Sequence, residues 1–362
     1  MGPDFDRETF LREYWQKQPL VIPNVAVNLA TLPSANELAG LALEEEVESR
    51  IISCDKGVWQ LEHGPFSAEA YDRGDQWTLL VQKVDHYLPE VASLRNLVNF
   101  LPRWRFDDVM VSYAVDGGGV GPHFDRYDVF LLQGAGHRRW RLGQFCDDQT
   151  PLQAHRDLSL LADFHVTEEY VLEPGDVLYV PPGRAHWGIA EGECITYSLG
   201  FRAASMADVM ARRVDQALEQ LDTTLLLEDG DSMDSGQRPG EITARQLDNA
   251  RTAFSNALTA LDDGSWLGRL VTETGENAVE SDAEGLSINS VVQLSPSARV
   301  AWRECNTELE VYCFGEAFSA PLACCPLLMR LCQGDWISLT DASQLERVLL
   351  DQLDTLGALI TG

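Results

Sequence analysis

The sequence predicts a mainly β protein with added helical parts, built around a small barrel or sandwich. Between about residues 53 and 202, short β-rich runs follow one another closely, and turns with Gly, Pro or Asp separate them. Helix-length periods are scarce in this stretch, and many short strands in close succession are typical of a small barrel or sandwich. After Phe201 the spacing of apolar residues becomes helical, so a helical region follows the β-rich part.

The N-terminal segment predicts a short helix and a strand that lead into the barrel. FLREYWQKQPLVIPN places Phe10, Tyr14 and Trp15 on an amphipathic helix, which stops at Pro19 and passes into a strand over residues 20–22. The barrel strands that follow are predicted in the runs VMVSYAV, DVFLLQ, RRWRLG, YVLEPGDVLYVPPG and CITYSLGF.

Helical spacing begins at Met206 and resumes over residues 242–270. A polar, glycine-containing loop over residues 228–241 separates the two helical stretches. A second polar stretch, residues 272–285, predicts a linker to a third unit.

The third unit, residues 286–362, alternates strand-like and helical segments, which favours a small winged-helix-like domain. Its last helix is expected over residues 342–360, with Thr340 or Asp341 as the N-cap. The unit holds four arginines, no lysine and nine acidic residues, which disfavours the DNA-binding role that such domains often have.

The chain is strongly acidic, with a formal net charge of −30 and a pI near 4.4. This charge repels phosphate backbones and anionic membrane surfaces, so neither nucleic acid nor membrane is an expected partner. It attracts basic proteins, although an acidic surface also serves solubility alone. No run of about 18 apolar residues and no apolar signal core occurs, so we expect a cytoplasmic protein.

The eight cysteines are scattered, and none forms a CxxC pair suited to zinc or redox chemistry. We therefore expect reduced, buried thiols. The residues are Cys54, Cys146, Cys194, Cys305, Cys313, Cys324, Cys325 and Cys332.

The stretch GGGVGPHFDRYDVFLLQG, residues 117–134, places His123 and Asp125 two positions apart after a run of glycines. On a β-strand both side chains project to one face, where they can bind one ion together. A third ligand is expected from His186, in EPGDVLYVPPGRAHWG, on a strand that returns antiparallel within the barrel. Two histidines and one carboxylate with open positions form the facial triad of non-haem Fe(II) oxygenases. A lone HxD pair also occurs by chance, so further residues nearby are needed to support a metal site.

The glycines of this stretch suggest a tight passage of the backbone beside the metal. Gly117, Gly118, Gly119 and Gly121 carry no Cβ, so the chain can approach its neighbours closely and bend there. We expect this loop to leave room for a polypeptide substrate to reach the ion. A simple β-bulge is the alternative reading of the same residues.

Arg138, in GAGHRRWRLG, is flanked by Arg139 and Arg141 in an otherwise acidic protein. Because side chains alternate along a strand, one face of this strand turns a guanidinium into the barrel. A buried guanidinium is costly unless an anion meets it, and its fork suits a carboxylate. A dicarboxylate that chelates iron at one end and meets Arg138 at the other is 2-oxoglutarate. The alternative is an arginine that pairs with Asp128 or with surface water.

Several blocks together resemble the JmjC-type (cupin-4) ribosomal oxygenases, above all the bacterial arginine hydroxylases of that family. They are WRFDDVMVSYAVDGGGVGPHFDRYDVFLLQGAGHRRWRLG, EPGDVLYVPPGRAHWG, YSLGFR and YWQKQPL. The resemblance implies a double-stranded β-helix, the cupin or JmjC jelly roll. It also implies a JmjC/cupin catalytic domain over residues 1–205, a helical dimerisation region over 206–271 and a winged-helix-like C-terminal domain over 286–362.

The resemblance also implies roles for individual residues of the site. It implies three Fe(II) ligands: His123, Asp125 and His186. It implies Arg138 as the partner of the distal carboxylate of 2-oxoglutarate, with Ser112 as a second contact. Thr196 and Ser198, on a late strand, are expected to line the same pocket. Asp116, beside the glycine run, is a candidate to receive a substrate guanidinium.

The implied activity is that of an Fe(II)- and 2-oxoglutarate-dependent dioxygenase, which uses O2 to hydroxylate the β-carbon of an arginine in the large-subunit ribosomal protein uL16. The alternatives are hydroxylation of a different residue, such as histidine, and a non-catalytic cupin module that binds a ligand. Residues 206–270 are expected to form a homodimer interface, unless their apolar stripe packs on the barrel of the same chain.

Overall fold

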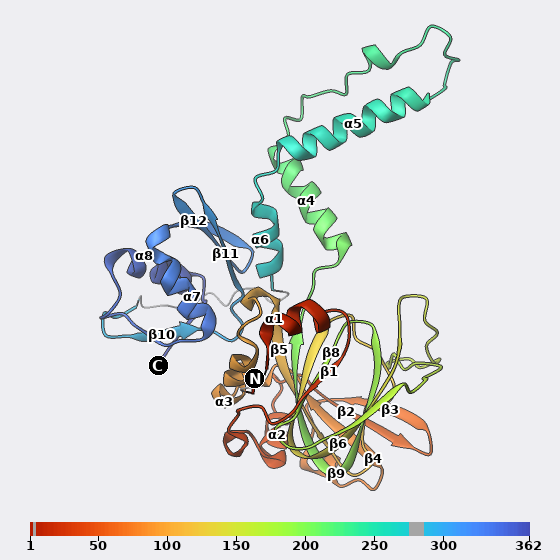
Figure 1. Cartoon of the computed structure of the whole chain (residues 1–362), viewed down its shortest axis with the longest axis vertical. Coiled ribbons are helices and arrows are strands. Elements are labelled where there is room, and N and C mark those ends of the chain that lie inside the picture. Colours follow the sequence, from red (N-terminus) through yellow and green to blue (C-terminus); the bar gives the residue numbers. More distant parts are fainter. Residues whose placement is uncertain (3–4, 275–285) are drawn as a thin grey trace.

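The computed structural model describes residues 1–2, 5–274 and 286–362. Figure 1 shows a β-barrel that carries the N-terminus, a pair of helices that projects away from it, and a smaller mixed unit that carries the C-terminus. The structure is mainly β around the site and helical after the barrel, as the sequence predicts.

The main sheet is antiparallel, in the order β1-β8-β6-β9-β5-β4-β2-β3, with β7 paired to β6. The apolar face of these strands forms the largest core of the protein. The strands are β1 (Leu20–Ile22), β2 (Ser49–Asp55), β3 (Val58–His63), β4 (Gln76–Val81), β5 (Phe106–Ala114), β6 (Asp128–Phe145), β7 (Glu168–Leu172), β8 (Val177–Val180) and β9 (Arg184–Phe201).

The two longest strands, β6 and β9, form the centre of the barrel because they pair with each other along most of their length. Their register shifts between Gln133 and His137 and again between Leu142 and Phe145. Such irregularities let long strands bend and re-aim side chains. The interior is then lined by alternate residues of these strands and of β5.

Short helices and 3₁₀ turns lie between the longer elements of the chain. Among them, α2 begins with a capping box at Ser34, and η6 leads directly into β5. They are α2 (Ala35–Leu41), α3 (Pro89–Ala92), η2 (Leu29–Thr31), η3 (Ala68–Tyr71), η4 (Val84–His86), η5 (Ser93–Val98), η6 (Arg103–Arg105), η7 (Gly230–Ser232) and η8 (Leu322–Cys324).

The N-terminal segment is helical, but less regular than its amphipathic pattern predicts: α1 (Arg7–Thr9) continues as the π-helical turn η1 (Phe10–Tyr14). The buried ring of Phe10 lies 5.0 Å from that of Tyr179 and 5.7 Å from that of Phe130. An aromatic cluster therefore anchors this segment to the barrel, and β1 follows at the predicted residues and pairs with β8.

Three helices follow the barrel: α4 (Met206–Gln220), α5 (Ala244–Ala260) and α6 (Ser265–Thr272). The first two begin with capping boxes at Ser205 and Thr243. In Figure 1, α4 and α5 project from the rest of the molecule, whereas α6 packs against the C-terminal strands. The helical prediction is confirmed here, while most of the linker predicted over 272–285 lies outside the described residues.

The C-terminal unit, residues 286–362, combines two small antiparallel sheets with two helices. One sheet is β11-β12-β13, and the other is β14-β10-β15. The elements are β10 (Val291–Leu294), β11 (Val300–Cys305), β12 (Glu308–Cys313), β13 (Glu316–Pro321), α7 (Cys325–Gln333), β14 (Ile337–Ser338), α8 (Gln344–Thr355) and β15 (Leu359–Thr361).

The last helix is shorter than the expected 342–360. The N-cap of α8 is Ser343, not Thr340 or Asp341, because the Ser343 side chain accepts the backbone N–H three residues on. After the helix, Gly357 adopts a φ of +69°, a conformation that favours glycine, and the chain then pairs as β15 with β10. A β-strand therefore takes the place of the last predicted helical turn.

All eight cysteines are free thiols, as expected, but only three of them are buried (Cys194, Cys313 and Cys324), and the other five are partly exposed. Within the described residues, no helix combines the length and the apolar character that crossing a membrane requires.

We predict that Phe10→Ala lowers the free energy of unfolding by about 3–5 kcal/mol, because the ring is buried among barrel aromatics and its loss leaves a cavity. Urea denaturation of the full chain measures this change. Leu11→Ala is the matched control: that side chain is 42% exposed, and the substitution should change the free energy by less than about 0.5 kcal/mol. Equal losses for both variants would contradict the anchoring role.

Candidate active site

A glycine-rich loop carries the chain from β5 along β9 toward the predicted metal site. Gly117 donates its N–H to the oxygen of Ala190 (3.0 Å), and Gly118 accepts the N–H of Ala190 (2.9 Å). A Cβ on Gly118 or Gly119 would lie 2.3 or 2.4 Å from a backbone oxygen of β4 or β9. The close backbone approach expected from the glycines is therefore present, and it leads the loop to His186.

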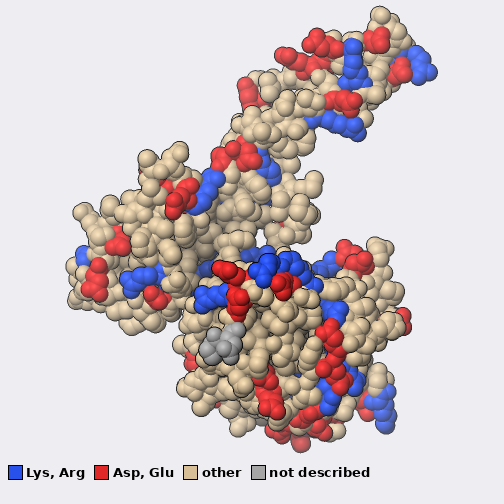
Figure 2. Space-filling model, in the orientation of Figure 1, with Lys and Arg blue, Asp and Glu red and all other residues tan. Residues whose placement is uncertain are grey.

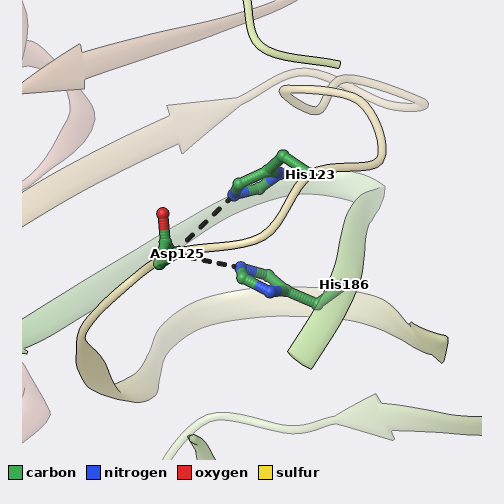
Figure 3. Close-up of side chains that lie close together, drawn as sticks. All are labelled: His123, Asp125 and His186. Atoms are coloured by element: carbon green, nitrogen blue, oxygen red, sulfur yellow. Dashed lines mark ion pairs between the residues drawn. The ribbon is translucent and has the colours of Figure 1, made fainter. Parts of the chain in front are cut away.

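His123, Asp125 and His186 come together, with their ligand atoms within 4.8 Å of one another. The Asp125 Oδ2 lies 3.4 Å from Nε2 of His186 and 4.0 Å from Nε2 of His123. Figure 3 shows both rings directed at the carboxylate. His186 belongs to β9, but His123 and Asp125 lie in the loop before β6, not on the strand we expected. In place of strand alternation, an isolated bridge between the two histidines and a hydrogen bond from the N–H of Gly183 to the backbone oxygen of Asp125 (2.7 Å) hold the three groups together.

Backbone carbonyls fix the orientation of both imidazoles. Nδ1 of His123 lies 2.9 Å from the oxygen of Gly121, and Nδ1 of His186 lies 2.9 Å from the oxygen of Arg184. Because a carbonyl only accepts, each Nδ1 carries the proton, so Nε2 of the neutral ring has a lone pair for a metal, and only a protonated ring donates from Nε2 to Asp125. Metal-binding histidines use this kind of second contact to fix their tautomer.

The three groups change one another's pKa. Burial raises the pKa of Asp125, but the hydrogen bond from His186 and the two nearby imidazoles outweigh it and lower this pKa to about 2. Burial and the neighbouring His186 lower the pKa of His123. Burial lowers the pKa of His186, but the bond to Asp125 and its charge give a net increase. The site thus combines an ionised carboxylate with imidazole nitrogens, a donor set that suits a divalent transition metal.

The triad faces a cavity of about 370 Å³ inside the barrel. Its walls come from β2, β4, β5, β6 and β9 and from residues 158–160. Polar side chains line it at two places along β5, at Ser112 and at Asp108. Four residues of strand separate these by roughly 13 Å, so the cavity has two distinct polar ends.

Arg138 points into this cavity from β6, and its two neighbours point out. Arg138 is 5% exposed, while Arg139 and Arg141 form ion pairs with Glu169 at the surface. The alternation predicted for this strand is confirmed. Gly188 of β9, which is paired with Trp140, leaves space beside Arg138, because a Cβ there would lie 2.7 Å from the Trp140 ring and 3.0 Å from Cδ of Arg138.

Only one nitrogen of the Arg138 guanidinium donates a hydrogen bond within the described part of the protein. Its Nη1 donates to Oγ of Ser112 (3.2 Å), but Nη2 and Nε are buried and find no acceptor among the described residues. Asp128, the alternative partner, is bound instead by Tyr179 (2.7 Å) and Arg105 (2.9 Å). A buried cation with unused N–H groups is costly unless an anion accepts them. The inner end of the cavity is therefore built for an anionic ligand.

The other predicted contacts occupy different places. Ser198 lines the cavity from β9. Thr196 is fully buried, and its hydroxyl donates to Oε1 of Gln133 (3.1 Å), so it lies behind the lining residues. Asp116 lies in the glycine loop, does not line the cavity, and accepts the N–H of Gly192 (2.7 Å).

Sequence reasoning missed the second polar end of the cavity. Asp108 and Met110 share the β5 face of Ser112, and period-two alternation from Ser112 could have identified them. Asp108 is 8% exposed, and its Oδ2 accepts from Nε2 of Gln82 (3.0 Å) and from the N–H of Lys83 (3.2 Å). A buried carboxylate thus faces the cavity opposite the arginine end.

Comparisons with known proteins agree with this geometry. The family model described as JmjC domain matches residues 93–209. The ribosomal protein uL16 3-hydroxylase of Escherichia coli is 38% identical over 268 residues, which cover 73% of this chain and 71% of the relative.

Solved structures match over nearly the whole chain. The X-ray structure of ycfD from E. coli has a TM-score of 0.83 at 30% identity and covers 99% of both chains. YcfD, a ribosomal oxygenase, in complex with cobalt and 2-oxoglutarate has a TM-score of 0.80 at 30% identity, covering 99% of this chain and 98% of that one. With its barrel, its triad and these relatives, the chain belongs to the family of JmjC-domain ribosomal oxygenases.

Proposed function

We propose that the protein is an Fe(II)- and 2-oxoglutarate-dependent hydroxylase that acts on the β-carbon of an arginine in uL16. One observation carries the proposal: the His–Asp–His triad and a partly unpaired guanidinium face the same cavity. A 2-oxo dicarboxylate needs a metal at one end and a cation at the other, and this cavity offers both.

His123, Asp125 and His186 would hold the iron and leave coordination positions open for co-substrate and O2. When bound, Fe(II) and 2-oxoglutarate supply an oxidation in which O2 and 2-oxoglutarate are consumed and a hydroxyl group, succinate and CO2 are formed. The chain contributes the ligand geometry, a water-excluding cavity and the orientation of the reactants.

Arg138 would bind the distal carboxylate of 2-oxoglutarate through the N–H groups that have no acceptor in the protein. A charge-assisted, forked pair of this kind is among the stronger polar contacts. Ser112, which already meets Arg138, and Ser198 would complete this end of the cavity. Thr196 would support the wall through Gln133 and not touch the ligand.

At the opposite end, Asp108 would receive the guanidinium of the substrate arginine. Among the described residues, both hydrogen bonds to this carboxylate reach Oδ2, which leaves Oδ1 for a ligand. Burial and the charge of Asp107 raise the pKa of Asp108, so a bound cation would stabilise its ionised form. We place this role at Asp108 and not at Asp116, whose carboxylate holds the turn at Gly192.

The charge of the protein supports a basic protein substrate. The net charge is −30, and acidic side chains are spread over the barrel, the projecting helices and the C-terminal unit on the face shown in Figure 2. A cationic ribosomal protein such as uL16 would be attracted, whereas ribosomal RNA would be repelled. We therefore propose a cytoplasmic enzyme that binds its protein substrate without binding nucleic acid directly.

We also propose three functional parts: a catalytic domain over residues 1–205, a dimerisation region over 206–271 and a winged-helix-like domain over 286–362. Helices α4 and α5 project from the body and expose large apolar side chains that a second copy of the chain would cover. Examples are Met206, Met210, Leu218 and Phe254.

Mass spectrometry tests the proposed reaction. Recombinant uL16 incubated with the protein, Fe(II), ascorbate, O2 and 2-oxoglutarate should gain one oxygen atom on one arginine, because both ends of the cavity are then filled. His123→Ala should abolish the gain by removing a metal ligand. His137→Ala, an exposed histidine on β6, is the control and should retain it.

Other outcomes of this measurement separate the alternatives. An oxygen on a histidine would replace the arginine assignment, and turnover of 2-oxoglutarate to succinate without modification of uL16 would overturn the substrate. If neither the peptide nor 2-oxoglutarate changes, a non-catalytic ligand-binding module becomes the better description.

We predict that Arg138→Met raises the KM for 2-oxoglutarate by about 10- to 100-fold, because a charge-assisted hydrogen bond contributes about 1.5–3 kcal/mol. Succinate formation at varied 2-oxoglutarate concentration gives the KM. Arg139→Met, one residue along on the outer face, should leave it unchanged. A normal KM in the Arg138 variant would remove the carboxylate role.

Light scattering at micromolar concentration tests the dimer. The wild-type protein should have about twice the mass of one 40.2 kDa chain. Met206→Glu with Met210→Glu places two charges on the apolar face of α4 and should give a monomer. Leu152→Glu, an exposed apolar site on the barrel, is the control and should stay dimeric. A monomeric wild type would exclude the interface.

A further inference from the structure

The pairing of β5 with β9 contains a β-bulge beside the cavity. The register shifts there so that two residues of β5, Asp107 and Asp108, face one residue of β9, Gly200. Consecutive residues of a regular strand point to opposite faces, yet both of these aspartates line the active-site cavity. Bulged residues lose regular ladder bonds, so their positions depend on other contacts.

Two arginines bind the first aspartate of the bulge. Arg202, at the end of the barrel, lies 3.3 Å from Oδ2 of Asp107, but its side chain is 59% exposed, and such surface pairs contribute little. Arg299 donates to Oδ1 of Asp107, and its side chain is only 14% exposed. Arg299 comes from the C-terminal unit, directly before β11, so a separate part of the chain holds the rim of the cavity.

The segment that carries Arg299 is itself fixed to the barrel. Arg103, in η6 just before β5, donates through Nε to the oxygen of Ala298 (3.0 Å) and through Nη2 to the oxygen of Ser295 (2.7 Å). Arg299 also donates through Nη1 to the oxygen of Glu273 (3.0 Å). The barrel thus holds the turn before Arg299, and Arg299 in turn holds the barrel's bulge.

We propose that Arg299 is a positioning residue of the active site: it fixes the bulge at Asp107 and thereby holds Asp108 where it can receive the substrate guanidinium. The inference rests on the proposed function, because it deepens the substrate end of that site. Arg299 also balances the charge of Asp107, which would otherwise repel the charge that Asp108 needs to bind a cation. The C-terminal unit would therefore take part in substrate recognition without touching the substrate.

Steady-state kinetics of the full chain with an arginine peptide of uL16 test this role. Arg299→Gln should raise the KM for the peptide about tenfold, while kcat and the KM for 2-oxoglutarate stay within about twofold. Arg299→Lys, which keeps the charge, should recover part of the loss. Arg303→Gln is the matched control, since Arg303 lies four residues further along, on β11, binds Glu310 and does not line the active-site cavity. An unchanged peptide KM in Arg299→Gln, or an equal effect in the control, would overturn the proposal.

A double-mutant cycle tests whether Arg299 acts through the bulge. If it does, adding Arg299→Gln to Asp107→Asn should raise the peptide KM no further than Asp107→Asn alone. Fully additive effects would show that the two side chains act independently and would overturn the proposal.

Hydrogen exchange measured by mass spectrometry gives a readout that needs no activity. The peptide spanning residues 105–111 should exchange faster in Arg299→Gln than in wild type, and Arg303→Gln should not change it. If the wild-type protein leaves uL16 unmodified, the proposed function fails, and this measurement still decides the positioning role: unchanged exchange would overturn it.

Discussion

Two backbone hydrogen bonds, between the N–H and oxygen of His123 and those of His186, hold the candidate metal site in place. They are 3.1 and 2.8 Å long, and they fasten an irregular loop to the central strand β9. The glycines upstream allow the loop to run against that strand, and carbonyls at the back of each ring set its tautomer. Asp125 follows two residues later and is held in turn by the N–H of Gly183, which donates to the backbone oxygen of Asp125 (2.7 Å). The geometry of all three groups therefore depends on the hydrogen bonds that fasten this loop, with the His123–His186 bridge as the link to β9.

The cavity keeps polar groups that the protein alone does not satisfy. Arg138 has unused donors at one end, and Asp108 has an oxygen without a bond at the other, among the described residues. Buried polar groups of native proteins are normally paired, so such exceptions mark places where a ligand completes the structure. The charge of each incompletely bonded group indicates its ligand: an anion for the Arg138 guanidinium and a cation for the Asp108 carboxylate.

Residue type and strand period were enough to predict much of the site. Alternation required that one face of the Arg138–Arg141 segment turn a guanidinium into the barrel, and the family resemblance assigned this role to Arg138. Two features could not be predicted, because they break the period. His123 and Asp125 share a face through a single bridge in a loop, which leaves no repeating pattern. Asp107 reaches the cavity beside Asp108 only because of a bulge, and one inserted residue looks like ordinary strand in the sequence.

Arg138 lies on β6, which is paired with β7 on one side and with β9 on the other, and His186 lies on β9 itself. The backbones of Arg138 and His186 thus belong to one hydrogen-bonded sheet, and the interval between these two positions cannot change unless ladder bonds break. The cavity therefore fits a co-substrate of one particular length. An oxo acid with one carbon more or fewer between its two ends would leave either the metal or the arginine unmatched, so the spacing of these two strands contributes to selecting the length of the acid.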